Sequence, residues 1–270
     1  KEFGAAVNIT SSTTGLVIPP SNTLIVYSLA SGGVSIAALF LAGYIPGILT
    51  GLLMMIVAMI WAKKNNYPVG KRSSLKEVFV KFIDAFPSLL LLVIVIGGII
   101  GGIFTATEAS AVAVLYTVLL SFYYKEMSLK DLPKVILESV ETTSIVMLLI
   151  GASMCMSWVL SYENIPQDIS NALLSVSDNK IVILLMINVI LLAVGIFMDA
   201  TPAVLIFTPI FLPIVTALGM DPTHFGIVLM LNLCIGLCTP PVGSVLFVGV
   251  GIAKTSISKV INCIAIKNSR

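Results

Sequence analysis

Long stretches without any ionisable side chain dominate this sequence. No Asp, Glu, Lys, Arg or His occurs between Phe3 and Ala62, and a membrane-spanning helix needs only about 20 predominantly apolar residues. That stretch therefore predicts two spans. Further uncharged runs cover residues 86–107, 109–124, 142–162, 181–198, 200–220 and 225–253. Because barrel strands have only about ten residues of alternating character, the pattern predicts an all-α integral membrane protein, a multi-span helical bundle.

Composition agrees with this pattern and excludes a soluble enzyme. Hydrophobic residues make up 58% of the chain, charged residues 10%, and the mean hydropathy is +1.09, whereas a soluble domain carries roughly 25% charged residues. No nucleophile–base pair or nucleotide loop is recognisable, and the single histidine, His224, is expected in an interfacial loop. We expect no enzyme activity, no organic cofactor and no nucleic-acid partner. The cysteines are expected to be small packing residues: Cys155, Cys234, Cys238 and Cys263.

Basic residues gather on one side of the predicted spans. Single spans are expected at 35–61, 86–105, 107–124 and 140–161. The loops 62–82 and 125–139 then lie on one side and carry Lys63, Lys64, Lys71, Arg72, Lys76, Lys81, Lys125, Lys130 and Lys134. The loop 162–180 lies on the other side and offers only Lys180. Because cytoplasmic loops carry the excess of Lys and Arg, we expect 162–180 to be periplasmic and a tail at 255–270 to be cytoplasmic.

Residues 181–220 form two apolar runs separated only by a turn at Asp199. We favour a re-entrant hairpin whose tip stops inside the membrane; two complete spans with a carboxylate at the turn are the alternative. Pro202, Pro209 and Pro213 are expected to weaken the second limb as a regular span. Irregular backbone is tolerated at membrane depth where it lines a cavity. The hairpin also keeps the basic tail on the cytoplasmic side.

A short internal repeat links two of the uncharged runs. The segment 13–22, TTGLVIPPSN, aligns without gaps on the segment 234–243, CIGLCTPPVG, and the two share Gly, Leu and both prolines. Each Pro-Pro pair removes backbone donors and forces the chain out of the α region, so each run predicts a discontinuous helix. The two are expected to cross the membrane in opposite directions, and such inverted repeats point to a transport site. Two proline kinks in ordinary spans are the alternative.

These features divide the chain into four regions. Residues 1–34 are the discontinuous helix of a first, partial repeat, and residues 35–139 hold the scaffold spans and the cytoplasmic loops. Residues 140–254 are the transport elements of the second repeat, which include hairpin 181–220 and broken helix 223–253. Residues 255–270 are the tail. Two full repeats would need more than the 270 residues present. We therefore expect a fragment that lacks the counterpart of the hairpin.

Oxygen atoms around the two breaks and the hairpin tip are the candidate ligands. Broken helices expose carbonyls and amides without a partner in the helix. Carbonyls beside hydroxyls suit a small hard cation, and helix amino termini suit an anionic substrate group. The first break offers Ser11, Ser12, Thr13, Thr14 and Gly15. The second break and the hairpin tip offer Gly236, Cys238, Thr239, Ser244, Asp199 and Thr201.

Two carboxylates lie within apolar runs, where a charged group is costly and usually functional. Glu108 is expected to have a structural role, complementing the positive end of a helix that Thr107 caps. Asp199 either caps the second limb of the hairpin or binds a cation, and the sequence leaves both roles open.

At these residues the sequence resembles the large membrane (permease, DctM-type) subunit of tripartite ATP-independent periplasmic (TRAP) transporters. The resemblance is carried by EFGAAV at 2–7, GLVIPPS at 15–21, GIFTATEA at 102–109, FMDATP at 197–202 and TPPVG at 239–243. These stretches span nearly the whole chain. The tail after Lys259 departs from the family pattern, which continues into a final span.

The resemblance implies an elevator-type secondary transporter of the ion-transporter superfamily, driven by sodium ions and located in the bacterial inner membrane. It implies a small four-helix membrane subunit and a periplasmic substrate-binding protein as partners within and beside the lipid bilayer. An organic acid such as a C4-dicarboxylate or sialic acid would be the substrate. A non-transporting structural or regulatory subunit, or an inactive transporter fragment, is the alternative.

The family's sodium sites lie at the helix breaks and hairpin tips. The matching positions are Ser12, Gly15, Thr201, Gly236 and Thr239, and Thr14 and Asp199 complete the candidate sodium-site region. The candidate substrate contacts are Ser11, Pro19, Pro20, Pro240 and Pro241.

The charge asymmetry makes a topological prediction. A cysteine introduced at Ser175 should react with a membrane-impermeant reagent added from outside, because 162–180 is expected to be periplasmic, whereas one at Ser73 should be spared. Labelling of intact cells measures both positions. The reverse pattern would overturn the assignment.

The repeat predicts that this 270-residue chain does not transport by itself. Without the counterpart of the hairpin, only one side of the substrate pathway has a closing element. Reconstituted alone in vesicles, the chain should give no sodium-driven uptake even with binding protein present, whereas the complete system should. Robust uptake by the chain alone would refute both the fragment interpretation and the repeat alignment.

Overall fold

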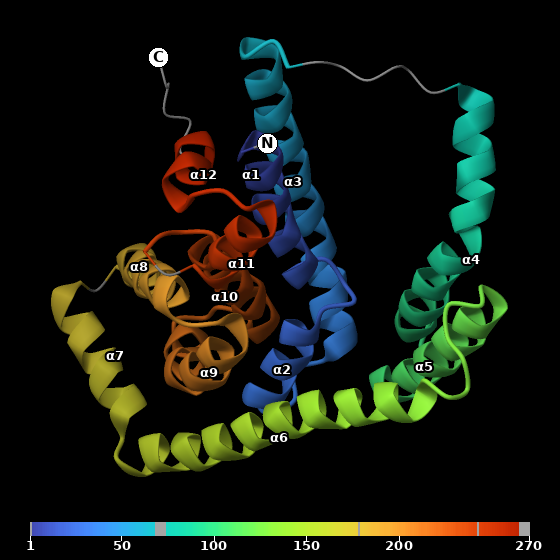
Figure 1. Cartoon of the computed structure of the whole chain (residues 1–270). Helices are drawn as coiled ribbons and strands as arrows, with labels where there is room; N and C mark the ends of the chain where they lie inside the picture. Colours follow the sequence, from blue (N-terminus) through green and yellow to red (C-terminus); the bar gives the residue numbers. More distant parts are fainter. Residues whose placement is uncertain (1, 68–73, 178, 242, 265–270) are drawn as a thin grey trace. The chain divides into compact units, whose positions relative to one another are not determined.

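The computed structural model is helical throughout the residues that it describes, 2–67, 74–177, 179–241 and 243–264, with no strand in these ranges (Figure 1). The elements are α1 (Glu2–Ser12), the 3-10 helix η1 (Thr13–Leu16), α2 (Asn22–Ala30), α3 (Ile36–Lys64), α4 (Leu75–Ile100), α5 (Ala106–Tyr123), α6 (Leu132–Tyr162), α7 (Ile165–Val176), α8 (Lys180–Phe197), α9 (Ala200–Ala217), α10 (Pro222–Leu237), α11 (Ser244–Ala253) and α12 (Ile257–Ile264). The prediction of an all-α protein is confirmed.

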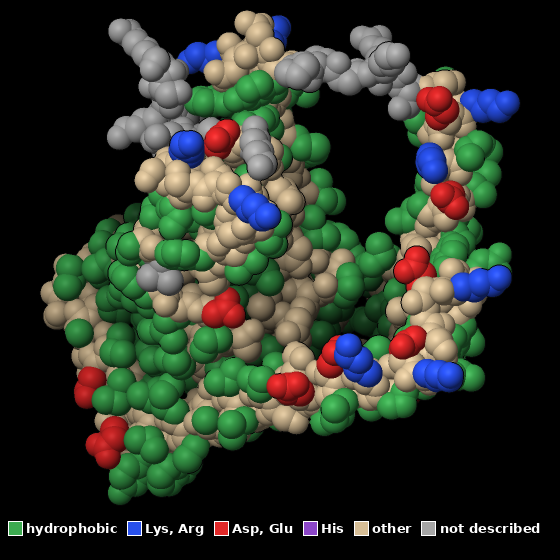
Figure 2. All heavy atoms as spheres, in the orientation of Figure 1, with side chains coloured by type: hydrophobic (Ala, Val, Ile, Leu, Met, Phe, Trp, Pro, Cys, Tyr) green, Lys and Arg blue, Asp and Glu red, His purple; other side chains and the backbone are tan. Residues whose placement is uncertain are grey.

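Six of the described helices, α3 to α6, α8 and α9, are long and apolar enough to cross a membrane, judged by length and composition. Many of their large hydrophobic side chains lie at the surface: Ile45 on α3 is 78% exposed and Leu148 on α6 is 75% exposed. Figure 2 shows hydrophobic side chains over much of the visible face and few charges between them. Soluble monomers rarely expose so much apolar surface. The chain is a multi-pass membrane protein.

The helices extend further than the sequence indicated. α4 begins inside the predicted loop 62–82, at a capping box in which the Glu77 carboxylate accepts a hydrogen bond of 2.9 Å from the Ser74 amide. α6 likewise begins inside the predicted loop 125–139. Amphipathic α7 fills most of the predicted loop 162–180. Uncharged runs in the sequence do not reveal this helix, because its polar face carries Asp168. Lys1, Lys71, Arg72, Ser73, Lys267 and Arg270 lie outside the described residues.

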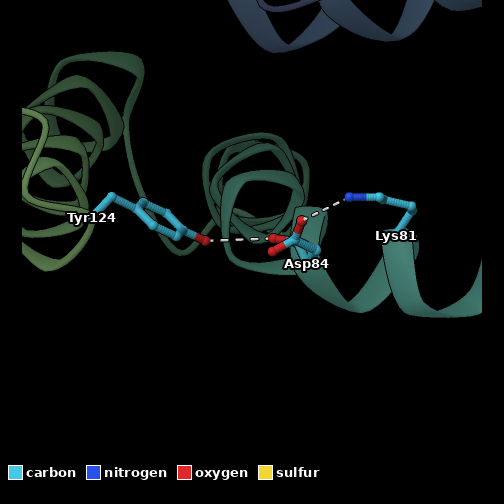
Figure 3. A network of polar contacts seen from close by, with 3 residues as sticks. All are labelled: Lys81, Asp84 and Tyr124. Carbon is cyan, nitrogen blue, oxygen red and sulfur yellow. Dashed lines mark hydrogen bonds and ion pairs between the residues drawn. The ribbon is translucent and has the colours of Figure 1, made fainter.

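Two compact units make up the chain, one of residues 62–148 and one of residues 1–61 with 149–270. In the first, α4 and α5 pack side by side, and the Tyr116 hydroxyl donates to the Pro87 carbonyl at 2.7 Å. The Tyr124 hydroxyl reaches the Asp84 carbonyl at 3.5 Å, and the Asp84 carboxylate lies 3.8 Å from the Lys81 amine (Figure 3). The two tyrosine contacts join α5 and its C-cap residue to α4, and the ion pair lies within α4. The four-region division made from the sequence stays a prediction.

The cap of α5 differs from the sequence prediction. Thr105, not Thr107, is the N-cap residue: its hydroxyl accepts from the Glu108 amide at 3.3 Å, and the Glu108 carboxylate accepts from the Thr105 amide at 2.8 Å. This reciprocal pair is a capping box. Thr107 lies two residues later, in the first turn of the helix. Glu108 has the structural role expected of it.

In the larger unit, the two interrupted helices pass each other in opposite directions. α1 packs against α11 and α12, whereas α2 packs against α9 and α10. Figure 1 shows the first group toward one end of the unit and the second toward the other. A core of Ala6, Ile9, Leu246, Val250 and Val260 fills the contact between α1, α11 and α12. The first half of one interrupted helix thus meets the second half of the other, as an inverted repeat requires.

The hairpin consists of α8 and α9, joined through Met198 and Asp199. The expectation that prolines weaken its second limb is wrong: α9 is continuous through Pro209 and Pro213. α9 is the most buried of the six long helices, and its packing against α2, α7 and α10 supports it despite the missing donors. Pro202 lies in the first turn, where an amide has no helical partner in any case.

Candidate functional site

The second helix break lies between α10 and α11. Asp221 is the N-cap residue of α10. Its carboxylate accepts from the backbone amides of His224 at 3.2 Å and Thr223 at 2.8 Å, and these bonds lower the pKa of Asp221. His224 therefore lies in the first turn of a helix rather than in the loop expected from the sequence. α10 ends at Leu237, and α11 restarts after Gly243, which has a positive φ of 44°. The donor-less pair Pro240 and Pro241 lies between them, exposed.

The tip of the hairpin docks on this break. The Gly243 amide donates to the Ile196 carbonyl at 3.1 Å, and the Ser244 hydroxyl donates to the Asp199 carboxylate at 3.3 Å. Just before the tip, the backbones of Gly195 and Gly236 touch, and a Cβ on Gly236 would overlap the Gly195 backbone. Only glycine allows this approach. The hairpin tip and the break are therefore one structural feature.

Four helix ends converge where they meet. α8 and α10 end here, at Phe197 and Leu237, and α9 and α11 begin here, at Ala200 and Ser244. The carboxyl ends carry partial negative charge and unpaired carbonyls, and the amino ends carry partial positive charge and unpaired amides. A cation and an anion can thus both be stabilised at this place, by different helix ends.

Polar side chains at the tip leave oxygen lone pairs available. The Thr239 hydroxyl donates to the Ile235 carbonyl at 2.6 Å, but a donating hydroxyl keeps its acceptor lone pairs. Thr201 is partly buried in the first turn of α9. Asp199 occupies the N-cap position of α9 but accepts no bond from the helix amides; its partner is Ser244 on α11. The capping role left open by the sequence is therefore not what this carboxylate does.

The first break is built differently from the second. Its opened backbone is satisfied locally, because the Leu16 carbonyl accepts from the hydroxyls of Ser21 at 2.6 Å and Thr23 at 3.3 Å. The side chains of Ser11, Ser12 and Thr14 each donate to a carbonyl three residues earlier. Pro19 is buried and Pro20 exposed, and Gly15 is exposed.

The two breaks cross at equivalent positions of the repeat. The Cys234 thiol donates to the Thr13 carbonyl at 3.3 Å, and these are the two residues at which the aligned segments begin. The Cys238 thiol lies 3.5 Å from the Ile9 carbonyl. The same offset relates Ile36, the first residue of α3, to Ile257, the first residue of α12. The inverted repeat thus extends beyond the Pro-Pro segments, and two of the cysteines hold the halves together.

A groove lies open beside the first break. It has a volume of about 540 Å³ and lies between α1 and α3, with Ser11 and Thr14 among its lining residues and Thr50 opposite. Gly15 is the repeat equivalent of Gly236, yet no atom lies within 4 Å of where its Cβ would be. The face that a hairpin covers in the second repeat is therefore open in the first.

The structure brings together some of the candidate residues and not others. Asp199, Gly243 and Ser244 are joined at the hairpin tip, close to Gly236. In the part of the chain that the structure describes, no hydrogen bond joins Thr201 to Thr239, or either of them to the candidates of the first break. Val242 lies outside the described residues. The Ile196 carbonyl could not be identified from the sequence, because every residue has a backbone carbonyl. The hydroxyls of Ser21 and Thr23 were also missed, although their place directly after a Pro-Pro pair could have indicated that they bond to the opened backbone.

Interrupted helices of opposite direction, with a hairpin docked on a break, are the architecture found in inverted-repeat membrane transporters. A family model described as "Tripartite ATP-independent periplasmic transporter, DctM component" matches residues 1–265. The chain belongs to this family, which confirms the resemblance seen in the sequence.

Relatives with curated descriptions agree with this assignment. The chain is 59% identical to "Uncharacterized protein YgiK" of Salmonella typhimurium over 96% of its length and 60% of the relative's. It is 42% identical to the C4-dicarboxylate TRAP transporter large permease protein DctM of Pseudomonas aeruginosa, over 91% of this chain and 58% of the relative. It is 39% identical to the sialic acid TRAP transporter large permease protein SiaM of Vibrio cholerae, over 92% of this chain and 58% of the relative. The chain spans about three-fifths of the length of these relatives, and the described functions are those of permeases, which points away from an enzyme.

The contact between the two glycines predicts an unequal response to alanine. Gly236→Ala should lower the unfolding free energy of the complete protein by about 1–3 kcal/mol, because the added methyl group forces α8 away from α10. Gly251→Ala, in α11, has no atom within 4 Å of the new Cβ and should leave stability unchanged or raise it slightly. Melting temperatures in detergent compare the two. Equal responses would contradict the close backbone contact.

Proposed function

We propose that this chain is the greater part of the large permease subunit of a sodium-coupled secondary transporter that imports an organic acid. The observation that carries the proposal is the docking of the hairpin tip on the second helix break, where four helix ends and several oxygen ligands meet. The tripartite, ATP-independent description of the family supports an ion gradient as the energy source.

Sodium is the ion that the ligands at the tip suit best. Within the described residues, no group of three or more His, Cys, Asp or Glu side chains gathers that could hold a metal ion, whereas carbonyl and hydroxyl oxygens are plentiful at both breaks. Such oxygens suit a small hard cation. In the second repeat, Gly236, Thr239, Thr201 and Asp199 would surround the ion. In the first, Ser12, Thr14 and Gly15 would contribute.

An anionic substrate would bind at the amino ends of α9 and α11, whose first-turn amides lack helical partners. Asp199 lies at the same place, and its negative charge repels a carboxylate. A sodium ion beside Asp199 would offset that charge. Binding of the ion would therefore favour binding of the acid, and this dependence of one on the other is what couples uptake to the sodium gradient. Ser11 and the two proline pairs would complete the substrate contacts.

The hairpin tip is proposed to stop inside the membrane. α8 and α9 have 18 residues each and could span by length, but their tip meets a helix break in the middle of an uncharged run. Two complete spans would instead place Asp199 at a membrane surface. In an elevator-type cycle, the hairpin and the broken helix would move together across the membrane and carry the site with them.

The open groove beside the first break supports a second hairpin in the complete protein. By repeat symmetry, the limb equivalent to α8 would pack along α1, as α8 packs along α10, and contact Gly15. A small four-helix membrane subunit and a periplasmic substrate-binding protein are the proposed partners, in the bacterial inner membrane. Relatives described as C4-dicarboxylate and sialic acid permeases support an organic acid as substrate.

Removing one hydroxyl at the tip tests the sodium site. In the complete transporter with its partners, Thr239→Val or Thr201→Val should raise the sodium concentration for half-maximal uptake about tenfold, because one ligand of a charged group is lost. Uptake of labelled substrate into vesicles measures this value.

Thr216→Val is the matched control. Its hydroxyl lies on the hairpin too and donates to the Leu212 carbonyl at 2.7 Å, much as the Thr239 hydroxyl does with Ile235, but it lies near the far end of α9. It should leave the sodium dependence unchanged. An unchanged sodium dependence in both Thr201→Val and Thr239→Val would move the site elsewhere.

A further inference from the structure

An amide pair lies in the apolar interface between α8 and α10. The side-chain amide of Asn232 donates to the side-chain carbonyl of Asn188 at 2.6 Å and to the Val228 carbonyl at 2.8 Å. The Asn188 amide in turn donates to the Leu184 carbonyl at 2.8 Å. Asn232 is only 6% exposed. Each asparagine therefore bonds to its own helix, and one bond joins the helices.

This pair fixes the register of the hairpin on the broken helix. Unpaired amides are costly in an apolar interior, and polar side chains hold helices together in membranes. Sliding α8 along α10 by one turn, about 5.4 Å, would separate the two asparagines. It would also move Gly195 away from Gly236, and the backbones of α8 and α10 touch at these two glycines because neither has a Cβ. Two contacts at different heights thus allow a single position of the hairpin tip.

We propose that Asn188 and Asn232 are a positioning pair that keeps the hairpin tip docked on the second break when no ion is bound. The inference rests on the proposed function, because the docked tip is the proposed sodium site. The pair touches neither ion nor substrate; it acts through the tip. Its consequence is a preformed site that sodium enters without first having to draw the hairpin onto α10.

Loss of the pair weakens sodium binding without altering the ligands. If the hairpin without the pair is docked one-fifth of the time, the apparent sodium affinity falls about fivefold, in proportion to the docked fraction. Saturating sodium restores docking, so the maximal rate of uptake is retained. A purely structural role would instead lower the amount of folded protein and leave the sodium dependence of the remainder unchanged.

The double variant Asn188→Leu/Asn232→Leu in the complete transporter tests the proposal. Replacing both partners by apolar groups of similar size leaves no orphaned amide, so folding is retained. Uptake in vesicles should show a half-saturating sodium concentration about fivefold higher, with the maximal rate within about twofold of the parent. If the double variant does not fold, Asn188→Ala is measured in its place, with the same change expected.

Hydrogen exchange of the Gly243 amide supplies a readout independent of transport, because this amide is bonded to Ile196 of the docked hairpin. Without sodium, it should exchange faster in the double variant than in the parent, and sodium should restore protection. Thr208→Val is the control: the Thr208 hydroxyl is fully buried on α9 and has no hydrogen-bond partner among the described residues. Both readouts should be unchanged in it.

Unchanged exchange and unchanged sodium dependence in the double variant would overturn the proposal. Sodium-independent uptake by the parent would instead contradict the proposed function. In that case the exchange measurement still decides the role of the pair: faster exchange of Gly243 supports it, and unchanged exchange refutes it.

Discussion

Backbone groups freed at a helix break inside a membrane must find partners within the protein, because hydrocarbon offers none. The first break meets this requirement locally, through the hydroxyl of Ser21 on the Leu16 carbonyl. The second break meets it at a distance, since the Gly243 amide pairs with the Ile196 carbonyl of the hairpin. The second break and the hairpin are therefore necessary to each other. The close glycine contact, the docked tip and the convergence of four helix ends all follow from that dependence.

Features that act locally along the chain could be predicted from the sequence. Proline removes a backbone donor wherever it lies, so the breaks at Pro19 and Pro240 could be located. Uncharged runs predicted the long helices, because the thickness of the bilayer sets the length of a spanning helix. The capping residue Thr105 was missed by two positions, since both threonines are suitable types and only the start of α5 distinguishes them.

Features that depend on which elements become neighbours could not be predicted. Asn188 and Asn232 are each unremarkable in sequence, and their bond exists only because α8 lies along α10. The Ile196 carbonyl carries no mark of its role, because every residue has a carbonyl. Asp199 was recognised as a costly carboxylate, but the choice between capping α9 and facing α11 depended on where Ser244 lies.

Thr13 and Cys234 occupy the same position in the two copies of the repeat, and they use their side chains differently. The Cys234 thiol donates across to the Thr13 carbonyl at 3.3 Å, whereas the Thr13 hydroxyl donates back to the Thr10 carbonyl of its own helix at 2.9 Å. One copy thus contributes a bond between the halves and the other a bond within its helix. The repeat therefore preserves the path of the backbone at this position without preserving the partner of the side chain.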